Sequence, residues 1–170
     1  GMTECGPIIT FDHWQTFRVT SCGKAVDRME LRINSSDPQH IVGEIFTRGA
    51  NVMHGYFENT EASESVLDKD GWLHTGDLGV IDGDGYLYIK GRSKNMILGP
   101  SGQNIYPEEM EDLLNATPYI AESLVVQRDG KLTALVYPEF EKLKKEGIPE
   151  NNLKKLMEEV RKNANQALPG

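Results

Sequence analysis

Two Asp-Gly turns, each set between short apolar runs, are the feature that most limits what this chain can fold into. Residues 80–81 and 86–89 flank Asp82-Gly83-Asp84-Gly85, and residues 122–127 and 132–137 flank Arg128-Asp129-Gly130-Lys131. A short Gly-containing turn between apolar runs is a strong signal for a β-hairpin. Each half of the chain is therefore expected to contain one antiparallel hairpin.

Further strands and helices are expected around these hairpins. Met29, Leu31 and Ile33 alternate with charged residues, which is typical of a half-buried strand, and residues 43–48 form another strand candidate. A short helix is predicted over residues 59–67, and a second one begins at Pro107 with acidic residues in its first turn. Apolar residues at helical spacing from 153 to 168 predict a longer amphipathic helix that packs on a core.

The charge is unevenly distributed and indicates two structural units. Residues 1–90 carry 7 basic and 14 acidic groups, whereas residues 91–170 carry 11 and 12. The overall excess of acid argues against a nucleic-acid-binding protein, which needs a basic surface. No apolar run approaches the roughly 20 residues of a membrane span. Two cysteines, Cys5 and Cys22, are too few for a disulfide framework, so a reducing, cytoplasmic location is expected.

Three polar, glycine-rich segments are candidates for function: residues 1–4, 75–77 and 91–111. Taken singly, each has a plain structural explanation. Gly76 and Gly79 are typical of turns, and a loop aspartate such as Asp77 commonly caps a backbone turn. His74 is best explained as a histidine whose hydrogen bonds are satisfied within a loop. From residue types alone, no complete enzymatic site is evident.

The order and spacing of these segments, however, resemble the adenylate-forming superfamily, which contains acyl-CoA synthetases, luciferases and the adenylation domains of peptide synthetases. The segments that carry the resemblance are residues 1–4, 71–78, 91–97 and 102–111. The sequences Val52-Met53-His54-Gly55-Tyr56 and Asn59-Thr60-Glu61-Ala62 look most like acyl-CoA ligases, and the long-chain fatty acyl branch is the first choice.

The resemblance implies a role for each matching residue. Glu4 would ligate Mg²⁺, which prefers carboxylate and phosphate oxygens, and Thr3 would lie against the nucleotide phosphate. Asp77 resembles the aspartate that accepts hydrogen bonds from both ribose hydroxyls, because a carboxylate offers two acceptor oxygens. Arg92 would add a donor to the ribose.

Two further positions concern the second half-reaction. Lys94 matches the hinge about which the small domain of the family rotates between adenylate formation and thioester formation. Gly102 would line the tunnel for the pantetheine arm of CoA, where a glycine permits close backbone approach. The loop around residues 99–101 is one residue longer than the usual pattern.

The resemblance also implies the architecture, an α+β chain of two parts. Residues 1–92 would be the β-rich C-terminal part of a large AMP-binding domain. Residues 93–170 would be a small mobile domain, with a short antiparallel sheet flanked by helices, cut before its last segment. The parent protein is expected to be a long-chain fatty acid–CoA ligase that uses ATP, Mg²⁺ and CoA, whereas the fragment alone is expected to be inactive.

Alternatives to this function stay open at the level of sequence. The parent could be a ligase for aryl or short-chain acids, since the residues that would decide this lie outside the chain. It could also be a non-catalytic module that binds a nucleotide or a partner protein. Peripheral contact with a membrane and the oligomeric state are likewise open.

Overall fold

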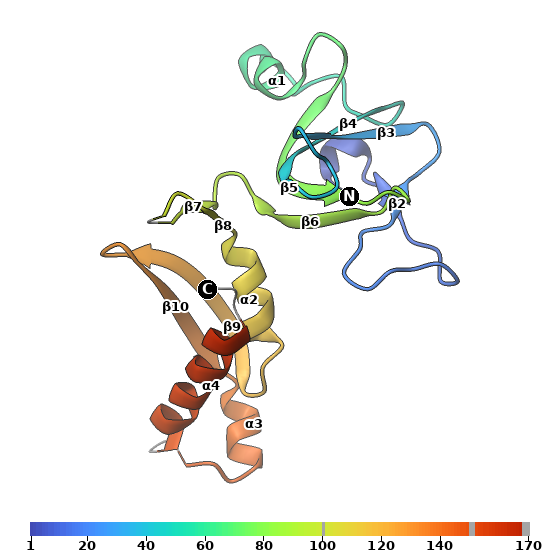
Figure 1. Cartoon of the computed structure of the whole chain (residues 1–170). Coiled ribbons are helices and arrows are strands. Elements are labelled where there is room, and N and C mark those ends of the chain that lie inside the picture. Colours follow the sequence, from blue (N-terminus) through green and yellow to red (C-terminus); the bar gives the residue numbers. More distant parts are fainter. Residues whose placement is uncertain (100, 150–151, 168–170) are drawn as a thin grey trace. The chain divides into compact units, whose positions relative to one another are not determined.

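The computed structural model describes residues 1–99, 101–149 and 152–167, with side chains to residue 165. The chain forms two compact units, Gly1–Lys94 and Asn95–Gly170, which are treated separately below (Figure 1). Antiparallel strands and helices occur in both units, so the predicted α+β class is confirmed. No helix within the described residues is long and apolar enough to cross a membrane.

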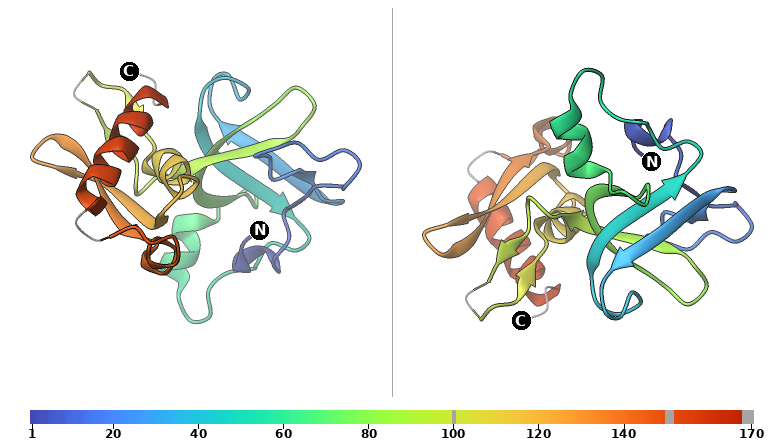
Figure 2. Two further views of the ribbon diagram at one scale, coloured as in Figure 1. Left: turned by 90° about the horizontal axis from the view of Figure 1, so that it is seen from below. Right: turned by 90° about the horizontal axis from the view of Figure 1, so that it is seen from above.

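The first unit is built on a four-stranded antiparallel sheet in the order β3-β4-β5-β6 (Figure 2). Its strands are β3 (Met29–Asn34), β4 (Gly43–Gly49), β5 (Leu73–Ile81) and β6 (Leu87–Arg92). The short strands β1 (Thr10–Phe11) and β2 (Lys24–Ala25) form a separate pair, and the 3-10 turn η1 (Thr3–Cys5) lies near the N-terminus. The helix α1 (Thr60–Val66) connects β4 to β5.

Local sequence explains several of these elements. Met29 and Ile33 of β3 are buried and the residues between them are more exposed, as the period-two pattern predicts. β5 and β6 form the predicted hairpin around residues 82–85. The side chain of Asn59 accepts a hydrogen bond from the Ala62 amide at 3.0 Å, so Asn59 is the N-cap of α1.

The second unit contains the other predicted hairpin. Strands β9 (Ile120–Arg128) and β10 (Lys131–Pro138) pair in antiparallel fashion, preceded by the short pair β7 (Ile97–Leu98) and β8 (Asn104–Ile105). Its helices are α2 (Pro107–Asn115), α3 (Phe140–Lys145) and α4 (Leu153–Ala167). Pro107 starts α2 as expected, whereas Leu168 of the predicted long helix lies outside the described residues.

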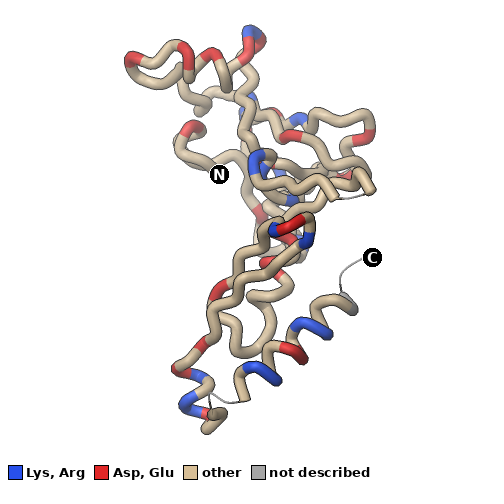
Figure 3. Tube along the Cα trace, turned by 90° about the vertical axis from the view of Figure 1, so that its left-hand side faces the viewer, with Lys and Arg blue, Asp and Glu red and all other residues tan. Residues whose placement is uncertain are grey.

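The core of the second unit joins the hairpin to two helices. Leu114 of α2, Ile120 and Val125 of β9, and Val160 of α4 form one buried cluster. Met157 and Ala164 of α4 pack against it, so the apolar stripe of this helix faces the core. Basic and acidic residues lie along the same helix (Figure 3). Apolar burial therefore accounts for the stripe.

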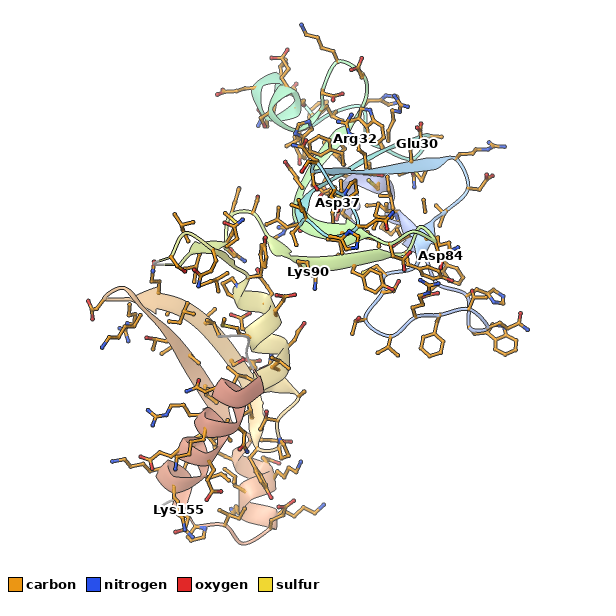
Figure 4. The ribbon with its side chains drawn as sticks, in the orientation of Figure 1. Glu30, Arg32, Asp37, Asp84, Lys90 and Lys155 are labelled. Carbon is orange, nitrogen blue, oxygen red and sulfur yellow. The ribbon has the colours of Figure 1, made fainter. Side chains whose placement is uncertain are left out.

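An ion-pair clamp fixes the loop of residues 12–22 in the first unit. The Arg18 guanidinium bonds to the carboxylates of Asp82 and Asp84, in the turn between β5 and β6. Asp84 is labelled in Figure 4. Its Cζ also lies 4.2 Å from the centre of the Tyr86 ring, and the Tyr86 hydroxyl donates to the Thr16 carbonyl at 2.8 Å. The loop is thus tied to the β5–β6 turn by several interactions.

The clamp should weaken in acid. Burial raises the pKa of Asp82. Hydrogen bonds from the amides of Tyr86 and Asp84 and the charge of Arg18 lower this pKa by more than burial raises it, so the net pKa is below the ordinary value. Because the folded-state pKa is lowered, the ionised carboxylate stabilises the fold fully at pH values above about 3.9, the usual pKa of aspartate. It is lost as the pH falls through the lower folded-state pKa. We expect Asp82→Asn to make the thermal midpoint fall less steeply across this acidic range.

The control for this measurement is Asp27→Asn, because the Asp27 side chain is 96% exposed and its contact with Arg28 is long, at 3.7 Å. The pH profile of the thermal midpoint should match that of the wild type in the control. An identical profile for Asp82→Asn and wild type would contradict the role given to the clamp.

Candidate functional site

The Thr75-Gly76-Asp77 segment lies inside strand β5, so the interpretation of these residues as a turn is wrong. The register of β5 shifts against β4 and again against β6, and Gly76 has a φ of +71°, in the left-handed region. The Gly76 amide donates to the side chain of Glu44, at Oε1, over 3.1 Å. A glycine with positive φ therefore occurs here in an irregular strand rather than in a turn. The local sequence is the same for both cases and could not distinguish them.

Thr75 stabilises this irregular region through two hydrogen bonds of its side chain. Its side chain is buried, and its hydroxyl donates to the Ile45 carbonyl at 2.8 Å while accepting from the Asp77 amide at 3.1 Å. On the other side, the Ser93 amide donates to the Gly76 carbonyl at 2.9 Å. The backbone that carries Asp77 is therefore held on both flanks.

Asp77 and Arg92 form an ion pair across the β5–β6 ladder. They are register partners, and Arg92 Nε donates to Asp77 Oδ1 at 2.6 Å. The Asp77 side chain is 25% exposed and that of Arg92 is 58% exposed. Asp77 Oδ2 accepts no hydrogen bond from any described residue, so a carboxylate fixed at one oxygen offers the other to a hydroxyl donor.

Thr3 and Glu4 lie in η1, where hydrogen bonds from Gly6, Met53 and Tyr56 hold them. The Met53 amide donates to the Glu4 carbonyl at 2.7 Å, and the Tyr56 hydroxyl donates to Glu4 Oε1 at 3.1 Å. Burial and the neighbouring Glu4 carboxylate raise the pKa of Tyr56, so the hydroxyl stays protonated and serves as a donor. Thr3 itself is exposed, and its carbonyl accepts from the Gly6 amide at 3.2 Å.

The other two predicted positions lie elsewhere. Lys94 is exposed and is the last residue of the first unit. Gly102 belongs to the second unit, in the turn between β7 and β8, with a φ of +83° and open space where a Cβ would lie. Its backbone conformation therefore explains the glycine. Pro100, in the loop that is expected to be one residue longer than the family pattern, lies outside the described residues.

The structure thus joins the predicted residues in two groups, Asp77 with Arg92 and Thr3 with Glu4. Sequence reasoning missed two contacts at these groups, the Tyr56 hydroxyl on Glu4 and the Glu44 carboxylate on Gly76. Tyr56 stands 52 positions after Glu4 and Glu44 stands 32 before Gly76. The only available signal was that Tyr56 belongs to a segment already noted for its resemblance to acyl-CoA ligases.

Glu4 can serve as a carboxylate ligand for magnesium. Among the described residues, no cluster of three or more histidine, cysteine, aspartate or glutamate side chains could hold a metal ion. Mg²⁺ is commonly bound through one or two carboxylates together with substrate phosphates. Glu4 fits this mode, because its Oε2 accepts no hydrogen bond from a described residue while Oε1 is held by Tyr56.

Comparison with known proteins gives a consistent result. A family model described as AMP-binding enzyme matches residues 1–57. The indoleacetate–CoA ligase of Aromatoleum aromaticum is 48% identical over 112 residues, which cover 64% of this chain and 22% of that protein. A long-chain-fatty-acid–CoA ligase of Gallus gallus is 39% identical over 137 residues, covering 80% of this chain and 18% of that protein.

Solved structures agree with these relatives. The anthranilate CoA ligase AuaEII, in complex with anthranoyl-AMP, matches all of this chain and 32% of its own, with a TM-score of 0.84 and 26% identity. O-succinylbenzoate CoA synthetase of Bacillus subtilis, in complex with ATP and magnesium, matches 82% of this chain and 30% of its own, with a TM-score of 0.74 and 34% identity. The chain therefore spans a third or less of the length of these proteins. The family model, the relatives and the solved structures all support assignment to the superfamily of AMP-binding, adenylate-forming enzymes.

Proposed function

We propose that this chain is part of an ATP-dependent acid–CoA ligase. Residues 1–92 would complete its large nucleotide-binding domain, and residues 93–170 would belong to its small mobile domain. The observation that carries the proposal is the Asp77–Arg92 pair, in which a partly buried carboxylate is fixed at one oxygen and open at the other. Relatives with this fold include a ligase in complex with ATP and magnesium and one in complex with an acyl-adenylate.

In this proposal the chain binds and orients the nucleotide. Asp77 accepts hydrogen bonds from the ribose hydroxyls, and Arg92 donates to the ribose while holding Asp77 in place. Thr3 lies against the phosphates, and Glu4 supplies a carboxylate ligand for magnesium. The metal, when bound, neutralises phosphate charge.

The reaction assigned to the site has two steps. A substrate carboxylate oxygen attacks the α-phosphorus of ATP, and the bond to pyrophosphate breaks. The thiol of CoA then attacks the carbonyl carbon of the acyl-adenylate, losing its proton, and AMP leaves. Lys94 would be the hinge between the steps, and Gly102 would line the CoA passage. Rotation about one hinge would allow a single pocket to serve both steps.

We further propose that the acid is a long-chain fatty acid. The long-chain ligases of chicken and rat, 39% and 35% identical to this chain, support this choice. Relatives that act on indoleacetate and succinylbenzoate favour the alternative, an aryl or short-chain acid. The free thiols of Cys5 and Cys22 fit a cytoplasmic location. Peripheral contact with a membrane would bring the protein close to a fatty acid substrate.

The test is carboxylate-dependent exchange of pyrophosphate into ATP, measured on the complete protein with acids of increasing chain length and with aryl acids. We expect exchange that is greatest with long acyl chains, and none with the 170-residue chain alone. A maximum with aryl or short acids would reject the long-chain choice but keep the ligase. A folded protein without exchange for any acid would favour a non-catalytic, ligase-like module.

A further inference from the structure

The loop of residues 51–56 is bonded to the N-terminal segment of residues 4–8 at three points. The Asn51 side chain donates to the Ile8 carbonyl at 2.7 Å, and the Met53 amide donates to the Glu4 carbonyl at 2.7 Å. These two bonds hold the backbone at Ile8 and at Glu4. The third bond, from the Tyr56 hydroxyl to Glu4 Oε1 at 3.1 Å, is the one that reaches the carboxylate itself.

From this geometry we propose that Tyr56 is a positioning residue for the Glu4 carboxylate, holding Oε1 so that Oε2 is presented to the magnesium of bound ATP. The inference rests on the proposed function, since it concerns the metal–nucleotide complex of that site. A ligating carboxylate that is oriented by an outer hydrogen bond loses less freedom when the metal binds. Tyr56 acts through Glu4 and does not itself touch the metal.

Tyr56 is in turn held by the start of α1. Its amide donates to Ser63 Oγ at 2.8 Å, and the Ser63 hydroxyl donates to the Asn59 carbonyl at 2.7 Å. Gly55 has a φ of +147°, and a Cβ added there would lie 2.9 Å from Ser63 Oγ. Only glycine lets the chain pass this close to Ser63 without strain. The ring of Tyr56 is therefore directed by a fixed backbone rather than by a free loop.

These contacts explain how the segment Val52-Met53-His54-Gly55-Tyr56 would orient the Glu4 carboxylate. Gly55 permits the close approach to α1, Tyr56 carries the donor, and Met53 supplies the backbone bond to Glu4. A purely structural tyrosine would not need its hydroxyl on this particular carboxylate. The distinguishing property is thus the hydroxyl, which Tyr56→Phe removes while leaving the ring.

The test measures metal binding directly. In the complete protein, Mn²⁺ is titrated in the presence of a non-hydrolysable ATP analogue, and free Mn²⁺ is followed by electron paramagnetic resonance. Loss of an outer-shell partner typically weakens metal affinity 10- to 100-fold. We expect Tyr56→Phe to weaken Mn²⁺ binding about tenfold. Exchange activity should return toward the wild-type rate at saturating metal, because the hydroxyl orients the ligand and takes no part in the chemistry.

Tyr119→Phe is the matched control. Tyr119 in the second unit donates its hydroxyl to Glu146 Oε2 at 2.7 Å, so this variant also loses a tyrosine–carboxylate bond, but at a position with no proposed role in metal binding. Its Mn²⁺ affinity should equal that of the wild type. Equal affinities for Tyr56→Phe and wild type, or equal losses in both variants, would overturn the inference. A wild type that binds no Mn²⁺ with nucleotide would overturn the proposed function, and this inference with it.

Discussion

Replacing Asp77 by alanine in the complete protein is expected to lower pyrophosphate exchange about 100-fold at subsaturating ATP. The ribose would lose two hydrogen bonds to a charged acceptor, each contributing about 1.5 kcal/mol or more. A loss of about 3 kcal/mol corresponds to roughly two factors of ten in rate. Arg92 would also lose the carboxylate that it contacts at 2.6 Å. Initial rates across a range of ATP concentrations measure the effect.

Asp77→Asn refines this expectation, because the amide keeps one acceptor oxygen but its NH₂ group cannot accept. Its loss should lie between those of wild type and Asp77→Ala. Asp27→Ala is the control, since Asp27 is 96% exposed and lies outside both residue groups of the site. If Asp77→Ala kept wild-type exchange at low ATP, the assignment of Asp77 to the ribose would be wrong.

Elements with a local cause were predictable from the sequence. The two hairpins follow from Asp-Gly turns between apolar runs, and α1 begins where Asn59 can cap it. Each of these signals lies within a few residues of the element that it specifies. The irregularity of β5 at Gly76 was not predictable in this way, because it depends on Glu44 and Ile45 of the neighbouring strand.

The candidate site divides along the same line. The Asp77–Arg92 pair spans a single hairpin, so once the hairpin is known the two residues are expected to be neighbours. The contact of Tyr56 with Glu4 joins segments 52 positions apart, and neither periodicity nor turn chemistry specifies it. The resemblance to adenylate-forming enzymes identified the segments of Glu4 and of Tyr56 separately, without relating one to the other. Only the fold shows that one donates a hydrogen bond to the other.

Leu73, at the start of β5, links the site to the stability of the first unit. It is 1% exposed and packs in a cluster with Cys5 of η1, Ile9 and Met29 of β3. The same turn carries Thr3 and Glu4, and the same strand carries Asp77. Removing apolar volume at Leu73 would therefore loosen both groups of predicted site residues at once.

Leu73→Ala is expected to lower the free energy of unfolding of the first unit by about 3 kcal/mol, within the usual range for a buried leucine in a core that cannot collapse. That is a large part of the roughly 5–15 kcal/mol by which domains are stable. Urea unfolding followed by tryptophan fluorescence measures it, since Trp14 and Trp72 both lie in this unit. Ile89→Ala, at a side chain that is 48% exposed, should cost far less. Equal losses for the two variants would mean that the cluster around Leu73 does not form the core of this unit.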